Sequence, residues 1–147
     1  MRAPLPWFRS AAAVLLLIGM SGCSSSDDAA APSADMPHMR PAEQGASSAL
    51  YFTLRNPGAD TLVLLGADID VAGSAGIHQS MDEGGMASMH PLDSLVVLPG
   101  DSAVLSERGL HVMANGLRAP LAAGDTVAVR LRFRGTRVDT LRVLVRE

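Results

Sequence analysis

Cysteine is almost missing from this chain of 147 residues, in which Cys23 is the only one. A single thiol cannot form a disulfide within the chain, so an apolar core has to hold the fold together. The same scarcity excludes metal sites that are built from several cysteines.

Lysine is absent, so all 12 basic residues are arginines, and 15 acidic residues bring the formal net charge to −3. A nucleic-acid-binding protein is expected to carry a basic stripe, and a protein that binds lipid head groups by charge carries a basic cluster. The composition argues against both kinds of partner. There is also no phosphate-binding loop, no supported Ser-His-Asp arrangement and no clear pair of catalytic carboxylates, so we do not expect an enzyme.

Long apolar runs are missing except at residues 11–20, which are too few to be interpreted first as a membrane-spanning helix. Arginines precede this run and small residues follow it, as in a secretory signal over residues 1–22. The sequence Met-Ser-Gly-Cys that ends at Cys23 resembles the bacterial lipobox, whose cysteine is acylated. This predicts a lipid-anchored protein of the bacterial cell envelope, on the periplasmic or extracytoplasmic face. The alternative is an ordinary cleaved signal with an accidental cysteine.

Residues 23–45 are rich in Ser, Ala, Pro and Asp and show no apolar periodicity, which predicts a flexible tether. Within it, Met36, His38 and Met39 could form an auxiliary metal site. A chance cluster is the favoured interpretation, because three ligands on an unstructured segment would have to be ordered on binding.

From residue 46 onward the pattern changes to short strands separated by Gly, Pro and Asn turns, without a convincing helix or an internal repeat. The clearest strand is 126–133, where apolar residues alternate with polar ones over eight positions. The expected strands are residues 50–55, 61–65, 94–98, 102–105, 110–113, 126–133 and 138–145, with turns that include Asn115-Gly116. About seven short strands predict an all-β sandwich or barrel over residues 46–147.

Histidine and methionine are the candidate metal ligands of this domain. His111 and Met113 are two residues apart on an expected strand, so they would project side by side, with Val112 in the opposite layer. His78 and Met89 flank a polar segment that contains glycines, where methionine is not needed to fill a core. Two imidazoles and two thioethers favour Cu(I) over zinc, and neutral ligands suit a monovalent ion.

Ten residues separate His78 from Met89, 21 separate Met89 from His111, and one separates His111 from Met113. This spacing resembles that of the periplasmic PCuAC copper chaperones. Residues 51–58 (YFTLRNPG) and 116–127 (GLRAPLAAGDTV) also resemble family segments, and the likeness covers about residues 46–147.

The resemblance implies a cupredoxin-like β-sandwich with His78, Met89, His111 and Met113 as Cu(I) ligands. It implies delivery of copper to another protein, such as the CuA subunit of cytochrome c oxidase or a thiol-bearing copper chaperone. Two places depart from the family pattern, since members often carry a methionine near Asn115 and a basic residue at the position of His90.

Several alternatives stay open beside this interpretation. Met81 and Met86 are interpreted first as loop or pocket-lining residues and second as auxiliary copper contacts, and His90 as an exposed histidine without a role. A blue-copper electron-transfer protein is rejected because that site needs a cysteine thiolate. Copper storage or sequestration, and a metal-free structural or adaptor lipoprotein, are the remaining alternatives to a chaperone.

Overall fold

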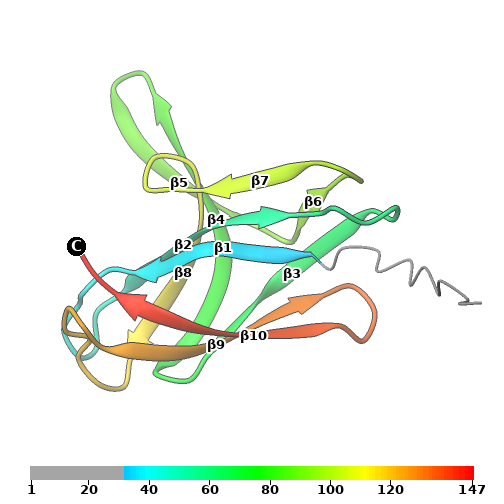
Figure 1. Cartoon of the computed structure of the whole chain (residues 1–147). Coiled ribbons are helices and arrows are strands. Elements are labelled where there is room, and N and C mark those ends of the chain that lie inside the picture. The colour runs from blue at the N-terminus through cyan, green and yellow to red at the C-terminus, as the bar shows by residue number, and fades with distance from the viewer. Residues whose placement is uncertain (1–31) are drawn as a thin grey trace, which may run out of the picture.

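Ten strands and no helix make up residues 32–147, the part of the chain that the computed structural model describes (Figure 1). The predicted signal segment and Cys23 lie outside these residues. Within the described part, no helix long and apolar enough to cross a membrane occurs. The strands are β1 (Ser33–Met39), β2 (Ser48–Arg55), β3 (Leu62–Ile69), β4 (Ala72–Glu83), β5 (Met86–Leu92), β6 (Leu95–Val97), β7 (Ser102–Leu105), β8 (Leu110–Leu117), β9 (Thr126–Phe133) and β10 (Val138–Val145).

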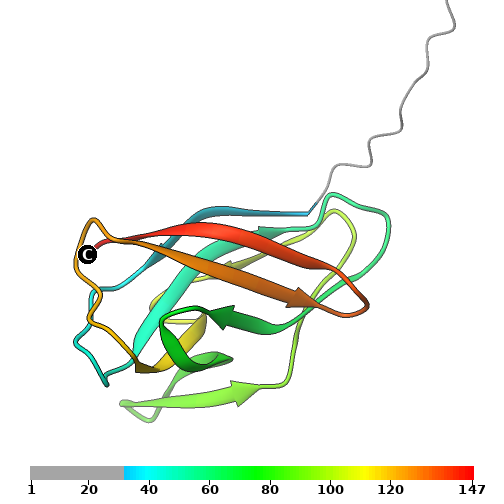
Figure 2. The ribbon, with the colours of Figure 1, turned by 90° about the horizontal axis from the view of Figure 1, so that it is seen from below.

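All ten strands join one sheet, in the order β5-β4-β8-β7-β2-β1-β10-β9-β3-β6, with β8 also pairing with β2. The pairs are antiparallel except β1 with β10 and β7 with β8. Figure 2, which views the molecule from below, shows the strands of this curled sheet in two layers. The predicted all-β, cupredoxin-like fold is confirmed.

The core lies between the inward faces of the curled sheet. Alternation along β9 supplies much of it, since Val127, Val129, Leu131 and Phe133 are each at most 3% exposed while the intervening arginines are exposed. Every strand except β5 places at least one buried side chain in or against this core. The largest fully buried side chains are Met39, Leu50, Leu54, Leu64, Ile77, Val112, Val129, Leu131, Val143, Val145 and Asn56.

Strands with one buried and one exposed face have the bounds predicted from the sequence. This holds for β9, β10 and β7, while β2, β3 and β8 extend beyond the predicted runs. The turn expected at Asn115-Gly116 is wrong, because β8 continues to Leu117 and pairs Asn115 with Ser74 of β4. Gly116 accommodates the strand with a φ of 61°, a conformation that glycine adopts without steric cost.

The predicted tether extends too far. Residues 33–39 form β1, which pairs with β2 on one side and runs parallel to β10 on the other. Met39 is completely buried in the core, and a register shift between Asp35 and His38 accommodates the irregular sequence around Pro37. The ordered domain therefore begins about thirteen residues before the predicted start at Ala46.

The polar segment expected to be a loop between His78 and Met89 is instead a β-hairpin. Strand β4 runs to Glu83, Gly84 and Gly85 form the turn with φ of 69° and 86°, and β5 returns from Met86. Positive φ at both central positions matches the twist of a two-residue hairpin turn. The green tip of this hairpin projects beyond the other strands in Figure 1.

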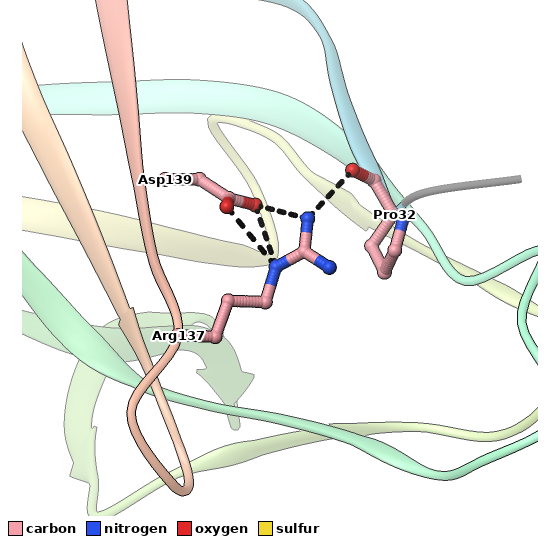
Figure 3. Close-up of polar contacts among 3 residues, drawn as sticks. All are labelled: Pro32, Arg137 and Asp139. Carbon is pink, nitrogen blue, oxygen red and sulfur yellow. Dashed lines mark hydrogen bonds and ion pairs between the residues drawn. The ribbon is translucent and has the colours of Figure 1, made fainter.

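Arg137 fixes the point where the chain enters the domain. Its guanidinium donates hydrogen bonds to both carboxylate oxygens of Asp139 at 2.8–3.1 Å and to the carbonyl of Pro32 at 3.3 Å (Figure 3). The same guanidinium lies 5.6 Å from the ring centroid of Phe133. Pro32, just before β1, is thereby held against Arg137, which lies between β9 and β10 near the C-terminal end.

Candidate metal centre

Strand β8 carries two of the four candidate ligands. His111 and Met113 lie on one face of the strand, while Val112 between them is fully buried in the core. His111 is only 3% exposed and Met113 is half-buried. The arrangement predicted for this strand is therefore the one that the structure has.

The register of β4 on β8 brings the third residue beside them. His78 is the direct cross-strand partner of His111, and their ring centroids are 6.0 Å apart. Residues directly opposite in an antiparallel pair project to the same face. Met113 is opposite Gly76, where the lack of a side chain leaves space next to His78: a Cβ at Gly76 would lie 3.6 Å from Nε2 of that imidazole.

Strand β5 adds Met89. Its partner on β4 is Ser80, which is two residues from His78 and so shares its face. Met89 therefore projects from the same side of the sheet as the two histidines and Met113. Three adjacent strands, β5, β4 and β8, present all four predicted ligands on one face.

The surroundings of the two imidazoles suit the binding of a cation. Nδ1 of His111 lies 3.1 Å from the carbonyl of Gly109, so this nitrogen carries the proton and Nε2 keeps a free lone pair. Nδ1 of His78 is buried and has no hydrogen-bond partner among residues 32–147. Burial, and then the nearby His111, lower the pKa of His78 below its usual 6.5, which favours the neutral imidazole.

An open pocket of about 340 Å³ gives access to three of the four candidate ligands, whereas His78 is not part of its lining. Met89, His111 and Met113 line it together with Tyr51, and Met89 is 45% exposed. The rim is polar and includes an ion pair of 3.6 Å between Arg40 and Glu107. A bound ion at this place would be close to solvent rather than sealed in the core.

Tyr51 is a residue of the site that the sequence did not single out. Its ring centroid lies 6.3 Å from that of His111 and 5.4 Å from that of His38, and only 6% of the residue is exposed. Burial is the main cause that raises the pKa of its phenol. The one signal available was its position in the segment that resembles the PCuAC family.

The cluster Met36, His38 and Met39 does not come together. Met39 is fully buried, whereas Met36 is 76% exposed and has a φ of 51°. His38 turns toward Tyr51, with its Nδ1 3.3 Å from the carbonyl of Met36 and 3.3 Å from the guanidinium of Arg146. An auxiliary site of all three side chains is therefore wrong.

Met81 and Met86 lie on the hairpin but not in the centre. Each alternates with the residues that face His78, so both project from the opposite face. Across residues 32–147, no three or more His, Cys, Asp or Glu side chains are placed to hold a metal ion. The candidate centre is therefore a mixed set of imidazoles and thioethers.

The model of the family described as "Putative lipoprotein LpqE-like" matches residues 33–145. The chain belongs to the LpqE-like family. A relative from Leifsonia xyli subsp. xyli, "Putative lipoprotein Lxx21020", is 30% identical over 134 residues, which cover 85% of this chain and 81% of the relative. Both the family and this relative of the LpqE-like chain are thus described as lipoproteins.

Solved structures of PCuAC domains share the fold of this LpqE-like protein. The Cu(I) form of DR1885 from Deinococcus radiodurans has a TM-score of 0.64 and 27% identity, covering 84% of this chain and 85% of that one. The apo PCuAC domain from PmoF1 has a TM-score of 0.64 and 18% identity, covering 77% of this chain and 91% of that one. The copper-bound PCuAC domain from PmoF2 has a TM-score of 0.63 and 18% identity, covering 76% of this chain and 89% of that one. The predicted likeness to PCuAC domains is confirmed.

Proposed function

We propose that this LpqE-like protein is an extracytoplasmic carrier of Cu(I), which binds at His78, Met89, His111 and Met113. The observation that carries the proposal is the meeting of these four side chains on one face of β5, β4 and β8. The Cu(I)-bound and copper-bound PCuAC structures with the same fold support it.

The chemistry of the four side chains favours a soft, monovalent cation. Zinc is usually held by thiolate, imidazole or carboxylate, whereas thioethers select Cu(I). All four donors are neutral, so the bound ion leaves a charge of only +1 at a half-buried place. The unpartnered Nδ1 of His78 shows that a polar atom there lacks a protein contact, and a metal bond would satisfy such an atom.

The access to the centre suits transfer of copper rather than storage. Met89 is 45% exposed and borders an open pocket, so ligands of an acceptor can enter before those of the carrier leave. Cysteine thiolates of the acceptor would replace neutral thioethers one at a time, and the anionic ligand binds Cu(I) more strongly. The acceptor would be a cysteine-bearing copper protein, such as a CuA-bearing oxidase subunit or a thiol-bearing chaperone. The protein would act without catalysing a reaction.

A lipid on Cys23 would hold the domain at the membrane surface. The family description as lipoproteins supports this anchor, and acylation would bind the chain without a spanning helix. Replacing Cys23 by serine should release the protein from membranes or block its maturation, because serine cannot carry the thioether-linked lipid. Unchanged membrane retention would indicate another anchor.

Metal binding is tested with a soluble chain that begins at residue 24. Under anaerobic, reducing conditions we expect tight binding of one Cu(I) and much weaker binding of zinc. His111→Ala and Met89→Ala should each weaken Cu(I) binding by about 100-fold or more, since loss of an outer contact alone can cost 10–100-fold. Met36→Ala, which removes an exposed methionine elsewhere, is the control. Tight zinc binding without copper, or equal effects of all three variants, would contradict the proposal.

Transfer is tested by mixing the Cu(I)-loaded chain with a metal-free acceptor and measuring which protein carries the metal. Deleting residues 24–31 should leave transfer intact, whereas a deletion that continues past Ser33 removes β1 and tests folding instead. If copper stays on the carrier with every thiol-bearing acceptor, sequestration becomes the better proposal.

A further inference from the structure

We propose a second Cu(I) site on the opposite face of the β4–β5 hairpin, with Met81, Met86 and His90 as ligands. This site is distinct from the centre around His78 and His111, and copper is the ion because its donors are again soft and neutral. Its existence does not depend on whether the first centre delivers copper.

The register of the hairpin places the three side chains together. On β4 the residues Gln79, Met81 and Glu83 face away from His78, and their partners on β5 are His90, Ser88 and Met86 in that order. Directly opposite and diagonal neighbours on one face of such a ribbon are within reach of long side chains. Met81 is thus diagonal to both Met86 and His90.

The contacts of His90 direct its imidazole along the face that carries Met81 and Met86. Its Nε2 lies 3.2 Å from Oγ of Ser88 and 3.5 Å from Oε1 of Glu83. Ser88 is the cross-strand partner of Met81, and Glu83 is two residues further toward the turn. The imidazole therefore points along the hairpin toward the turn, on the face from which Met81 and Met86 also project.

The two methionines have no role in packing. Met81 is 46% exposed and Met86 is 75% exposed, whereas Met39 fills the core as methionine ordinarily does. The turn beside them is open, because a Cβ at Gly84 or Gly85 would meet nothing within 4 Å. Flexible thioethers next to an imidazole form a ligand set for Cu(I).

Charge at the tip favours capture of a cation. Glu83 projects from the same face as the proposed ligands, and its Oε1 lies 3.5 Å from Nε2 of His90. Asp82, next to it, projects from the other face and adds a second negative charge at the tip. Acidic groups at an exposed tip raise the local concentration of cations. His90 would exchange its contacts with Ser88 and Glu83 for the metal, while the carboxylate stays close as a counter-charge.

The second site should be weaker than the first. Its side chains are exposed and must be ordered on binding, which makes its affinity about ten- to a hundredfold lower than that of the buried centre. A weak, exposed site is suited to capturing copper at the edge of the sheet, where β5 has no neighbour on its outer side among the ten described strands.

The experiment follows the six methionines from Met36 onward by ¹³C-methyl NMR while Cu(I) is added to the soluble chain from residue 24. The first equivalent should move the signals of Met89 and Met113, and the second those of Met81 and Met86. Met39 in the core and Met36 on β1 should stay unchanged and serve as internal controls. Native mass spectrometry counts the bound ions in parallel.

Variants separate this site from the first centre. Met81→Leu with Met86→Leu keeps side-chain volume, and this double variant should bind one Cu(I) instead of two, while Met36→Leu should still bind two. His111→Ala should retain the weaker ion, so failure of the first centre and failure of the second give different results. The proposal is overturned if the wild type never binds a second ion. It is also overturned if the double variant keeps that ion, because His90 and Glu83 alone would then form a nitrogen–oxygen site.

Discussion

The β9–β10 and β4–β5 hairpins are built from the same kind of strand but bury very different surfaces. In the β9–β10 hairpin, the inward face of β9 is buried along its whole length. On the outward face Arg132 pairs with Asp68 of β3 and Arg130 with Asp70 just after β3, each at 3.2 Å. In the β4–β5 hairpin, Ile77 is the last fully buried residue before the tip, and nothing from residues 81–87 is buried.

The β9–β10 hairpin therefore contributes mainly to the stability of the domain, whereas the β4–β5 hairpin carries two of the candidate metal ligands. A strand with one buried face contributes to the global free energy of unfolding, whereas an exposed hairpin opens or moves at lower cost. The candidate ligands His78 and Met89 lie where β4 and β5 leave the core. A carrier has to release its metal, and ligands on the less stable hairpin can move without unfolding the rest.

The largest effect is expected from the core of the β9–β10 hairpin. Leu131→Ala should lower the free energy of unfolding by about 2–5 kcal/mol, because it leaves a cavity in a packed core. Urea unfolding measures this, and the folded fraction should still bind Cu(I) with normal stoichiometry. The exposed Val96→Ala should change stability by less than about 0.5 kcal/mol. Loss of copper binding by the folded Leu131→Ala protein would contradict the idea that stability and metal binding depend on different hairpins.

A smaller effect is expected from filling the space beside His78. Gly76→Val should weaken Cu(I) binding by about tenfold, equal to about 1.4 kcal/mol, while the stability of the metal-free domain changes little. Ser74→Val, on the same face two residues away, is the matched control and should bind copper normally. Competition with a Cu(I) chelator measures the Cu(I) affinity of both variants. Equal affinity of the two variants would show that the space is not used.

Acid should destabilise the metal-free domain through His78. The folded pKa of this residue is lowered by burial, so as the pH falls below about 6.5 the unfolded chain takes up the proton first. Stability is therefore lost over the window from 6.5 down to the lowered pKa, and is unaffected by this group at higher pH. Urea midpoints at several pH values should show a shallower acid loss for His78→Gln. The same slope in both proteins would contradict this assignment.

The smallest effect is expected from the surface ion pairs of β9. Breaking the pair between Asp68 and Arg132, whose side chains are 49% and 44% exposed, should cost about 0.2–1 kcal/mol. A double-mutant cycle with Asp68→Asn and Arg132→Gln measures the coupling, which should fall further in high salt. A coupling of several kcal/mol would show that this hairpin depends on its charges rather than on its core.

The two hairpins also explain what the sequence could predict. Strand β9 alternates apolar and charged residues because one face is buried, so a period of two gives its bounds. The β4–β5 hairpin has no buried face near its tip and therefore no alternation to detect. Strand β1 was missed for another reason: Pro37 interrupts it, and its partner β10 lies about a hundred residues away.

The candidate centre was predictable as a set of residues but not as an arrangement. Spacing singled out His78 and His111, yet only the register of β4 on β8 makes them direct neighbours. Tyr51 and the carbonyl of Gly109 were not found, because a ring contact and a backbone hydrogen bond leave no pattern in the sequence. The four ligand assignments stay predictions until metal binding is measured.

With the proposed lipid on Cys23, the hydrogen bonds of Arg137 to Pro32 and Asp139 would limit how far the domain can lie from a membrane (Figure 3). With β1 starting at Ser33, only nine residues, 24–32, separate the domain from a lipid on Cys23, and fully extended they span at most about 30 Å. The predicted tether, ending at residue 45, would have reached more than twice as far. Under the proposed function, an acceptor embedded in or attached to the same membrane would be within reach, whereas one deep in the surrounding compartment would have to come to the surface.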